Sequence, residues 1–327
     1  MRILLRRLGF YLAAFAIAVT LNFFIPRMMP GDPLTRLMAA FKGKLTESQL
    51  AGLRQTYGYD GSLGYQFWVY IKNLAHLDFG VSTMTYPDPT SDLLFYAAGW
   101  TLFLVGIATA LSFGIGILMG IYSAWHRGGW FDSIFTPVNV MFTSFTPAIV
   151  ALILYYGLAL KWQIFPLGRA ETSGIPPGWT LDYAKDVAWH AVLPVLSIVI
   201  VNYGSWHLGM RNSIITLLNE DFVIMARAKG LDDRRIRNRY VARNAMLPQV
   251  ASLALSVGYV LGGALITEVV FNYPGLGKFS LSAIEARDYS FIAGQMILLT
   301  ASVLIANLLS DVVNVILDPR LRSRGHS

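Results

Sequence analysis

Six long, almost uncharged runs constrain the fold of this chain more than any other feature of its sequence. A helix needs about 20 apolar residues to cross the hydrocarbon core of a bilayer. The runs lie at Leu8–Pro26, Leu94–Ala124, Ser133–Leu160, Ala191–Leu217, Val250–Val270 and Phe291–Leu317. Only 14% of all residues are charged, whereas soluble domains usually carry about 25%. We therefore expect an all-α polytopic membrane protein with six transmembrane helices.

The first run, Leu8–Pro26, also admits an interpretation as a cleaved signal peptide, because three arginines precede it. A signal peptide ends in small residues at its cleavage site. This run instead ends in Phe23, Phe24, Ile25 and Pro26. We therefore predict that it is retained as the first transmembrane helix.

The basic residues predict which ends of the helices face the cytoplasm. Loops rich in Lys and Arg stay on the cytoplasmic side of a membrane. With both termini inside, the two terminal segments, Arg127, Arg211 and the segment Asp221–Pro248 place 15 of the 26 basic residues in the cytoplasm. We predict an N-in, C-in topology for this reason.

This topology divides the chain into four parts. Residues 1–26 form a cytoplasmic N-terminus and the first helix, and residues 27–93 form an extracytoplasmic insertion. Residues 94–317 form a core of five transmembrane helices, which includes a cytoplasmic loop at 218–248. Residues 318–327 form a cytoplasmic tail.

Glycines and prolines within the runs predict how the helices pack and bend. Gly116 and Gly120 have the spacing that lets two membrane helices approach closely. Pro137 and Pro147 lie within the third run, where the missing backbone N–H predicts a bend.

The most basic segment of the chain lies between the fourth and fifth runs. It carries seven basic and three acidic residues between Asp221 and Arg243. Its pattern predicts two short helices. The first covers about Phe222–Lys229 and ends at Gly230, since glycine best tolerates a left-handed helix stop. The second begins behind Asp232 or its neighbour Asp233, either of which can cap it, and continues to about Asn244.

Each helix of this hairpin has an apolar face. Phe222, Met225 and Ala226 share a face of the first helix, and Ile236 and Tyr240 share a face of the second. An apolar face held outside a membrane has to be buried against protein. The hairpin therefore predicts a protein partner.

The hairpin resembles the cytoplasmic coupling loop of ATP-binding-cassette (ABC) importer permeases, and in particular of the family that carries dipeptides, oligopeptides and nickel. The resemblance rests on Ala226-Arg227-Ala228-Lys229-Gly230-Leu231 and Arg243-Asn244-Ala245-Met246-Leu247-Pro248. Further blocks similar to the family occur in the same order. They are Pro30-Gly31-Asp32-Pro33, Leu77-Asp78-Phe79-Gly80-Val81-Ser82, His190-Ala191-Val192-Leu193-Pro194, Glu268-Val269-Val270-Phe271, Pro274-Gly275-Leu276-Gly277, Arg287-Asp288-Tyr289 and Leu317-Asp318-Pro319-Arg320. One departure is that Ile224 and Met225 stand where the broader motif has Glu and Ala.

The resemblance implies a type I ABC importer permease fold and a contact with an ATPase subunit. The first hairpin helix would dock in a cleft of that subunit, with Gly230 allowing the turn and Arg227, Lys229 and Arg234 pairing with acidic groups. The full set of expected coupling residues is Phe222, Met225, Ala226, Arg227, Ala228, Lys229, Gly230, Leu231, Arg234 and Ile236. The alternative is a basic topology anchor built from ordinary surface helices.

No nucleotide-binding loop occurs in the chain, because its Gly277-Lys278 lacks both the earlier glycine and the following Ser or Thr. We therefore expect no catalytic residue and no cofactor in this chain, with ATP and Mg bound by partner subunits. There is no cysteine and the five histidines are scattered, so no metal site is expected. The expected partners are a second homologous permease, one or two ATP-binding subunits, an extracytoplasmic solute-binding protein and membrane lipid, without nucleic acid.

Polar side chains within the third and fourth runs are candidates for lining the transport pathway. Asn139, Thr143 and Thr146 share one helical face, and such a stripe can line a water-filled path. Candidates in the fourth run are Asn202, Tyr203 and His207. Hydrogen bonding between helices is an equally good interpretation of each residue. Glu268 can likewise meet the solute or cap the turn that follows it.

The family resemblance implies short peptides as the cargo, in a bacterial or archaeal cytoplasmic membrane. Oligosaccharides and nickel chelates are alternatives within the same machinery. A secondary transporter driven by an ion gradient would be expected to show inverted repeats and buried charges, and neither is apparent. A membrane-embedded enzyme would need a catalytic constellation that the sequence lacks. A basic DNA-binding motif is incompatible with the apolar runs on both sides of the hairpin.

Overall fold

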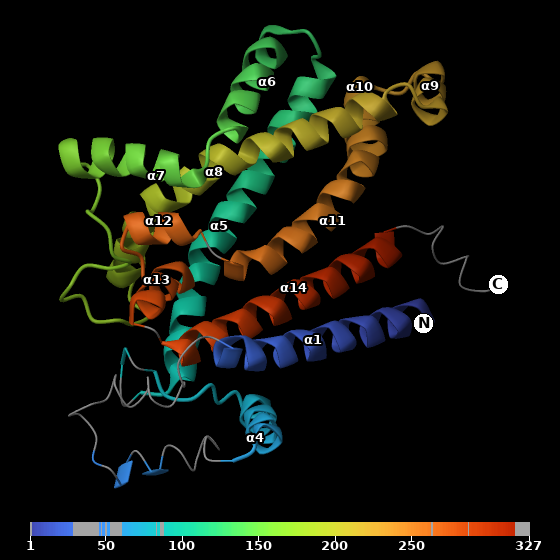
Figure 1. Cartoon of the computed structure of the whole chain (residues 1–327). Coiled ribbons are helices and arrows are strands. Elements are labelled where there is room, and N and C mark those ends of the chain that lie inside the picture. The colour runs from blue at the N-terminus through green and yellow to red at the C-terminus, as the bar shows by residue number, and fades with distance from the viewer. Residues whose placement is uncertain are drawn as a thin grey trace.

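The computed structural model describes residues 2–28, 46, 48–49, 51–52, 61–82, 84–85, 88–262, 264–286 and 288–317 (Figure 1). These residues fold almost entirely into helices. The first helices are α1 (Arg2–Met28), α4 (Leu63–Ala75), α5 (Thr90–Trp125), α6 (Trp130–Thr143), α7 (Pro147–Leu154), the π-helical η1 (Tyr155–Lys161) and α8 (Leu181–Leu217). They are followed by α9 (Asp221–Ala228), α10 (Asp233–Arg235), the π-helical η2 (Ile236–Ala242), α11 (Arg243–Tyr259), the 3₁₀ turn η3 (Val260–Gly262), α12 (Leu265–Val270), α13 (Leu276–Ala286) and α14 (Tyr289–Leu317).

Within the described residues, five helices are long and apolar enough to cross a membrane, and a bent pair provides a sixth. The pair consists of α6 and the α7–η1 segment, which meet at 98°. The break lies at Pro147, the first residue of α7. The residue before a proline is pushed out of the helical conformation, so Thr146 is extended and ends the first half. The six spans are confirmed, and the third is broken at one of its two prolines.

The fifth span differs from the prediction in its boundaries. The helix that begins behind Asp232 does not end near Asn244 but continues as one helical stretch, Asp233–Gly262. The predicted end of the span at Val270 belongs to the separate helix α12. Pro248 lies inside α11 without ending it. Neighbouring groups in membrane proteins can compensate for the hydrogen bond that a proline removes.

Helices α5 and α8 pack closely through the predicted glycine pair. A Cβ atom placed on Gly116 would lie 2.6 Å from the backbone oxygen of Tyr203, and one on Gly120 would lie 2.7 Å from that of His207. Both distances are shorter than any real contact, so only glycine allows this approach. The pair thereby fixes the central crossing of the core.

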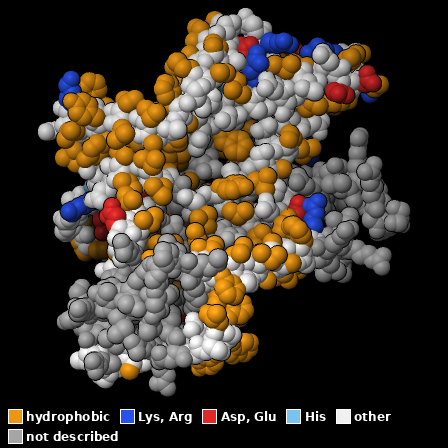
Figure 2. Space-filling view, viewed as in Figure 1, with side chains coloured by type: hydrophobic (Ala, Val, Ile, Leu, Met, Phe, Trp, Pro, Cys, Tyr) orange, Lys and Arg blue, Asp and Glu red, His pale blue; other side chains and the backbone are white. Residues whose placement is uncertain are grey.

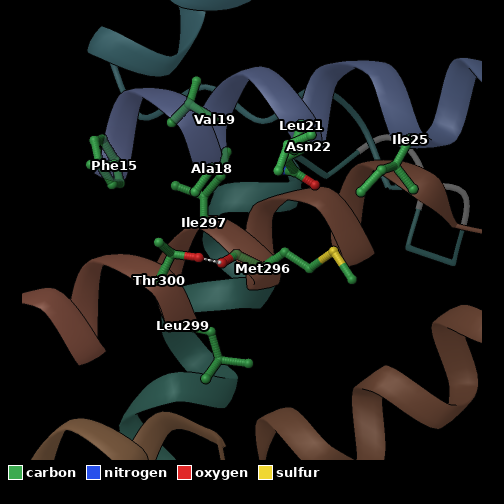
Figure 3. Close-up of a pocket in the computed structure, with 10 residues that line it drawn as sticks. All are labelled: Phe15, Ala18, Val19, Leu21, Asn22, Ile25, Met296, Ile297, Leu299 and Thr300. Carbon is green, nitrogen blue, oxygen red and sulfur yellow. Dashed lines mark hydrogen bonds between the residues drawn. The ribbon is translucent and has the colours of Figure 1, made fainter. Parts of the chain in front are cut away.

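Helices α1 and α14 run antiparallel to each other. The Tyr11 hydroxyl donates to Asp311 at 2.7 Å, and Arg7 forms an ion pair with the same carboxylate. Toward the other end, Asn22 Nδ2 donates to the backbone oxygen of Ala293 at 2.8 Å. Between these contacts lies an apolar cavity of about 330 Å³ (Figure 3). Figure 1 shows the start of α1 and the end of α14 on the same side as α9, which agrees with an even number of crossings.

Glu268, which lies in α12, has a structural role at the start of α13. The fully buried carboxylate accepts hydrogen bonds from the Thr101 hydroxyl at 2.8 Å and from the Gly277 N–H at 2.6 Å. Thr101 in turn accepts from the Leu276 N–H at 2.8 Å. A Cβ atom on Gly275 would lie 2.4 Å from this carboxyl group. Of the two roles left open by the sequence, the structure supports the capping role.

Candidate functional site

The hairpin between α8 and α11 contains α9 and α10, and it projects from one end of the molecule (Figure 1). Helix α9 stops where the sequence predicts. Gly230 has φ +70°, its N–H donates to the Arg227 oxygen at 2.9 Å, and the Leu231 N–H donates to the Ala226 oxygen at 3.3 Å. A left-handed residue that reverses the chain in this way typically is glycine.

The second arm of the hairpin begins at Asp232. Its side chain accepts a hydrogen bond from the Arg234 N–H at 3.1 Å, and so satisfies one of the free amides at a helix start. Of the two predicted capping residues, the structure selects Asp232. This arm continues directly into α11 as one helical stretch, Asp233–Gly262.

The buried face of α9 differs from the predicted one. The residues that turn inward are Val223 and Ala226, which are 0% and 4% exposed. They pack with Met210 and Ile214 of α8 and with Ile236 at the start of η2. Ala226 and Ile236, which were both expected to meet a partner, are therefore buried within the chain itself and support α9 from behind.

The outward face of α9 is also apolar. Phe222, Ile224 and Met225 are 37%, 57% and 59% exposed, and Ala228 is exposed beside them. Phe222 and Met225 are thus exposed, whereas Ala226, one turn after Phe222, is buried against the chain itself. The sequence interpretation missed Ile224, because it stands at the acidic position of the broader motif.

Charged side chains surround this outward face. Arg227, Lys229 and Arg234 are exposed, and none of the three forms an ion pair within the part of the chain that the structure describes. Figure 2 shows basic and acidic side chains gathered over the end of the molecule that carries the hairpin. Leu231 is half-buried and packs against the cluster that holds α9.

A buried ion pair joins the broken third span to α8 near the hairpin. Arg211 donates to both oxygens of Asp132, from Nε at 2.6 Å and from Nη2 at 2.8 Å. The hydroxyls of Ser123 and Thr136 and the Gly128 N–H also donate to this carboxylate. This set, which we call the Asp132 clamp, connects α5, α6 and α8. The sequence interpretation missed it, although each of its charged residues lies near the predicted cytoplasmic end of a span.

A second polar contact between α6 and α8 lies deeper in the core. Asn139 and His207 are both fully buried, and Asn139 Nδ2 and His207 Nδ1 are 2.8 Å apart. The opposite atoms, Asn139 Oδ1 and His207 Nε2, have no protein partner among the described residues. Next to this pair, Gly204 allows close contact with Thr143, whose Cγ2 would lie 2.9 Å from a Cβ atom there.

The break at Pro147 separates the predicted polar stripe. Asn139 and Thr143 lie on α6, whereas Thr146 precedes α7 and is exposed. The three residues therefore do not share one helical face, because the helix that would align them ends at Thr143. Asn202 and Tyr203 on α8 are half-buried.

Comparison with known proteins identifies the family. The family described as "Binding-protein-dependent transport system inner membrane component" matches residues 116–323, which include the hairpin and the core from the middle of α5 onward. The chain belongs to this family. It is a multi-pass inner-membrane permease subunit of an importer that contains further subunits.

Relatives of this permease match it along nearly its whole length. A peptide permease protein of Brucella suis is 31% identical over 324 residues, which cover 98% of this chain and 99% of the relative. The glutathione transport system permease protein GsiC of Escherichia coli is 31% identical over 318 residues, 97% of each chain. The resemblance seen in the sequence is thus confirmed at the level of the family. Among the described residues, no group of three or more potential ligands is placed to hold a metal ion.

Proposed function

We propose that this permease forms half of the translocation pathway of an ABC importer for short peptides, with the outward face of α9 docked on a separate ATPase subunit. The observation that carries the proposal is the exposed apolar face of Phe222, Ile224 and Met225 on a helix that projects from the core. Basic residues surround this face and lack ion-pair partners among the described residues. Such a surface suits an acidic, apolar cleft.

The structure offers a route by which force on α9 would reach the core. Val223 and Ala226 pack against Met210 and Ile214 of α8. Arg211, the residue after Met210 on α8, connects this helix to α6 through the Asp132 clamp. A push on α9 would therefore move α6 and α8 together. Alternating access needs such rigid-body rocking between two states.

In this proposal the permease itself is not catalytic, and ATP and Mg bind to one or two partner ATPase subunits. A second, homologous permease completes the pathway. A solute-binding protein delivers the cargo at the side that carries α4, opposite the hairpin. The half-exposed Tyr203, together with Asn202, Thr143 and Thr146, would line the path, whereas Asn139 and His207 would hold its wall in place.

Short peptides are proposed as the cargo because one relative is named a peptide permease and another a permease for glutathione, itself a tripeptide. Both match over almost the whole chain. The same transport machinery would serve oligosaccharides or nickel chelates. The choice of cargo therefore depends on the binding protein as well as on this chain.

Site-directed cross-linking tests the docking of α9. The chain contains no cysteine, so Met225→Cys introduces a single reactive thiol on the outward face. We expect this thiol to cross-link to the ATPase subunit in membranes, and ATP to change the yield. A matched control is Leu118→Cys, an exposed position on α5 within the span. Equal cross-linking from both positions, or none from Met225→Cys in an active importer, would contradict the proposal.

A further inference from the structure

A groove between α5 and the second arm of the hairpin is not explained by docking of the ATPase. It has a volume of about 670 Å³. Its lining consists of Ile121, Asn238, Arg239, Ala242, Arg243, Met246, Leu247 and Val250. All but Ile121 come from the continuous stretch of η2 and α11, at the spacing of one helical face. The groove therefore runs along one helix, and α5 forms its opposite wall.

The chemistry of this groove changes along its length. Arg239 and Arg243 are exposed at its hairpin end, whereas Met246, Leu247 and Val250 are half-buried further along. From Arg239 to Val250 the helix rises by about 16 Å, which is close to the depth of one leaflet in a hydrocarbon core about 30 Å thick. With the hairpin on the cytoplasmic side, a groove of this length would reach from the membrane surface into one leaflet.

The two arginines lack a counter-ion. Neither forms an ion pair within the described part of the chain, and no acidic residue lines the groove. Both extend from the same side of the helix, four residues apart, so a single anionic group can meet both guanidinium groups. Basic pockets between membrane helices on the cytoplasmic side are suited to anionic lipid headgroups.

We infer that this groove binds one phospholipid with an anionic headgroup, with the phosphate at Arg239 and Arg243 and an acyl chain along Met246, Leu247 and Val250. The charge of the arginines matches the headgroup, and the apolar wall matches the chain. The site lies on the helix that links the hairpin to the core. A bound lipid would therefore fill the space between α5 and α11 when the hairpin moves.

Native mass spectrometry of the purified full chain tests the inference. The protein is reconstituted in nanodiscs that contain equal amounts of phosphatidylglycerol and phosphatidylcholine, and the retained lipid is identified. We expect about a tenfold preference for phosphatidylglycerol, and its loss in the Arg239→Gln/Arg243→Gln double variant. The control Arg227→Gln/Lys229→Gln removes the same charge from α9 and should retain the preference. Absence of the preference in the wild type, or its equal loss in both double variants, would overturn the inference.

A fluorescence measurement locates the lipid in the assembled importer. Leu247→Cys provides a single labelling site in the groove, and Leu118→Cys provides one on the outer surface of α5. Brominated phosphatidylglycerol should quench the label at residue 247 more strongly than brominated phosphatidylcholine, while the two lipids should quench equally at residue 118. If neither lipid quenches the label at residue 247, a protein partner covers the groove and the inference is wrong. Cross-linking from Met225→Cys is independent of these results, so the proposed docking and the lipid site can fail separately.

Discussion

Arg211 holds Asp132 by two parallel hydrogen bonds, from Nε at 2.6 Å and from Nη2 at 2.8 Å, across 79 residues of sequence. The side chains of Arg211 and Asp132 are 16% and 6% exposed, and three further donors satisfy the carboxylate. It lies between the cluster that holds α9 and the polar contact between Asn139 and His207. The clamp is therefore placed to make α6 follow α8.

Removing one partner of the clamp should destabilise the permease strongly. Asp132→Asn leaves the Arg211 guanidinium buried without a counter-charge, and breaking a buried pair of this kind costs about 3–5 kcal/mol. We expect a lower midpoint of thermal unfolding in detergent for this variant. Ser123→Ala removes a single neutral donor and should cost only about 1 kcal/mol. Similar midpoints for Asp132→Asn and the wild type would show that the pair contributes little.

Gly230 should tolerate asparagine better than alanine. The space around its Cα is open, so strain comes from its φ of +70° and not from a clash. Gly230→Ala should therefore destabilise the hairpin by about 1 kcal/mol, whereas asparagine adopts this conformation more readily. Uptake by whole cells, normalised to the amount of permease in the membrane, measures the effect. Equal uptake by the two variants would argue against a role for this turn geometry.

The two faces of α9 should respond differently to substitution. Met225→Glu places a charge on the outward face, and we expect it to abolish co-purification with the ATPase while the thermal midpoint stays unchanged. Val223→Ala instead leaves a cavity in the cluster behind α9, and should lower stability by about 0.5–1.5 kcal/mol or more. If Met225→Glu destabilises the isolated chain as much as Val223→Ala does, then Met225 packs within the chain and is not available to the ATPase.

Substitution should also separate the wall of the pathway from its lining. Asn139→Ala removes the hydrogen-bond partner of the buried His207 Nδ1, and should reduce stability by about 1–3 kcal/mol. Thr146→Val changes an exposed hydroxyl that makes no cap hydrogen bond, and should alter the apparent KM for cargo without lowering the midpoint. Transport assays in proteoliposomes and thermal unfolding together measure both effects. If Asn139→Ala altered only KM and Thr146→Val lowered only the midpoint, Asn139 would line the pathway and Thr146 would support its wall.

Much of the membrane architecture follows from the sequence alone. The six runs, the turn at Gly230, the cap near Asp232 and the close crossing at Gly116 and Gly120 are local signals. Each depends on the length of an apolar run, on one backbone conformation or on a small side chain. The broken third span could also be predicted in part, because Pro147 pushes the residue before it out of the helical conformation.

Other features depend on which helices come together. Residues 222 to 226 of α9 are all apolar, so their pattern does not define a single buried face, and contact with α8 and η2 selects Val223 and Ala226. The predicted stripe through Thr146 fails for a similar reason, because the 98° break changes the direction of the helix.

The sequence by itself determined that this chain crosses a membrane six times and presents a basic hairpin, because those properties arise from neighbouring residues. Only the tertiary structure decided that Arg211 meets Asp132, that Glu268 caps α13 and that the hairpin continues into α11. The first two features involve residues far apart in the chain, and the third needs a helix that continues through Pro248. Their cause is the packing of one helix against another, which no local pattern contains.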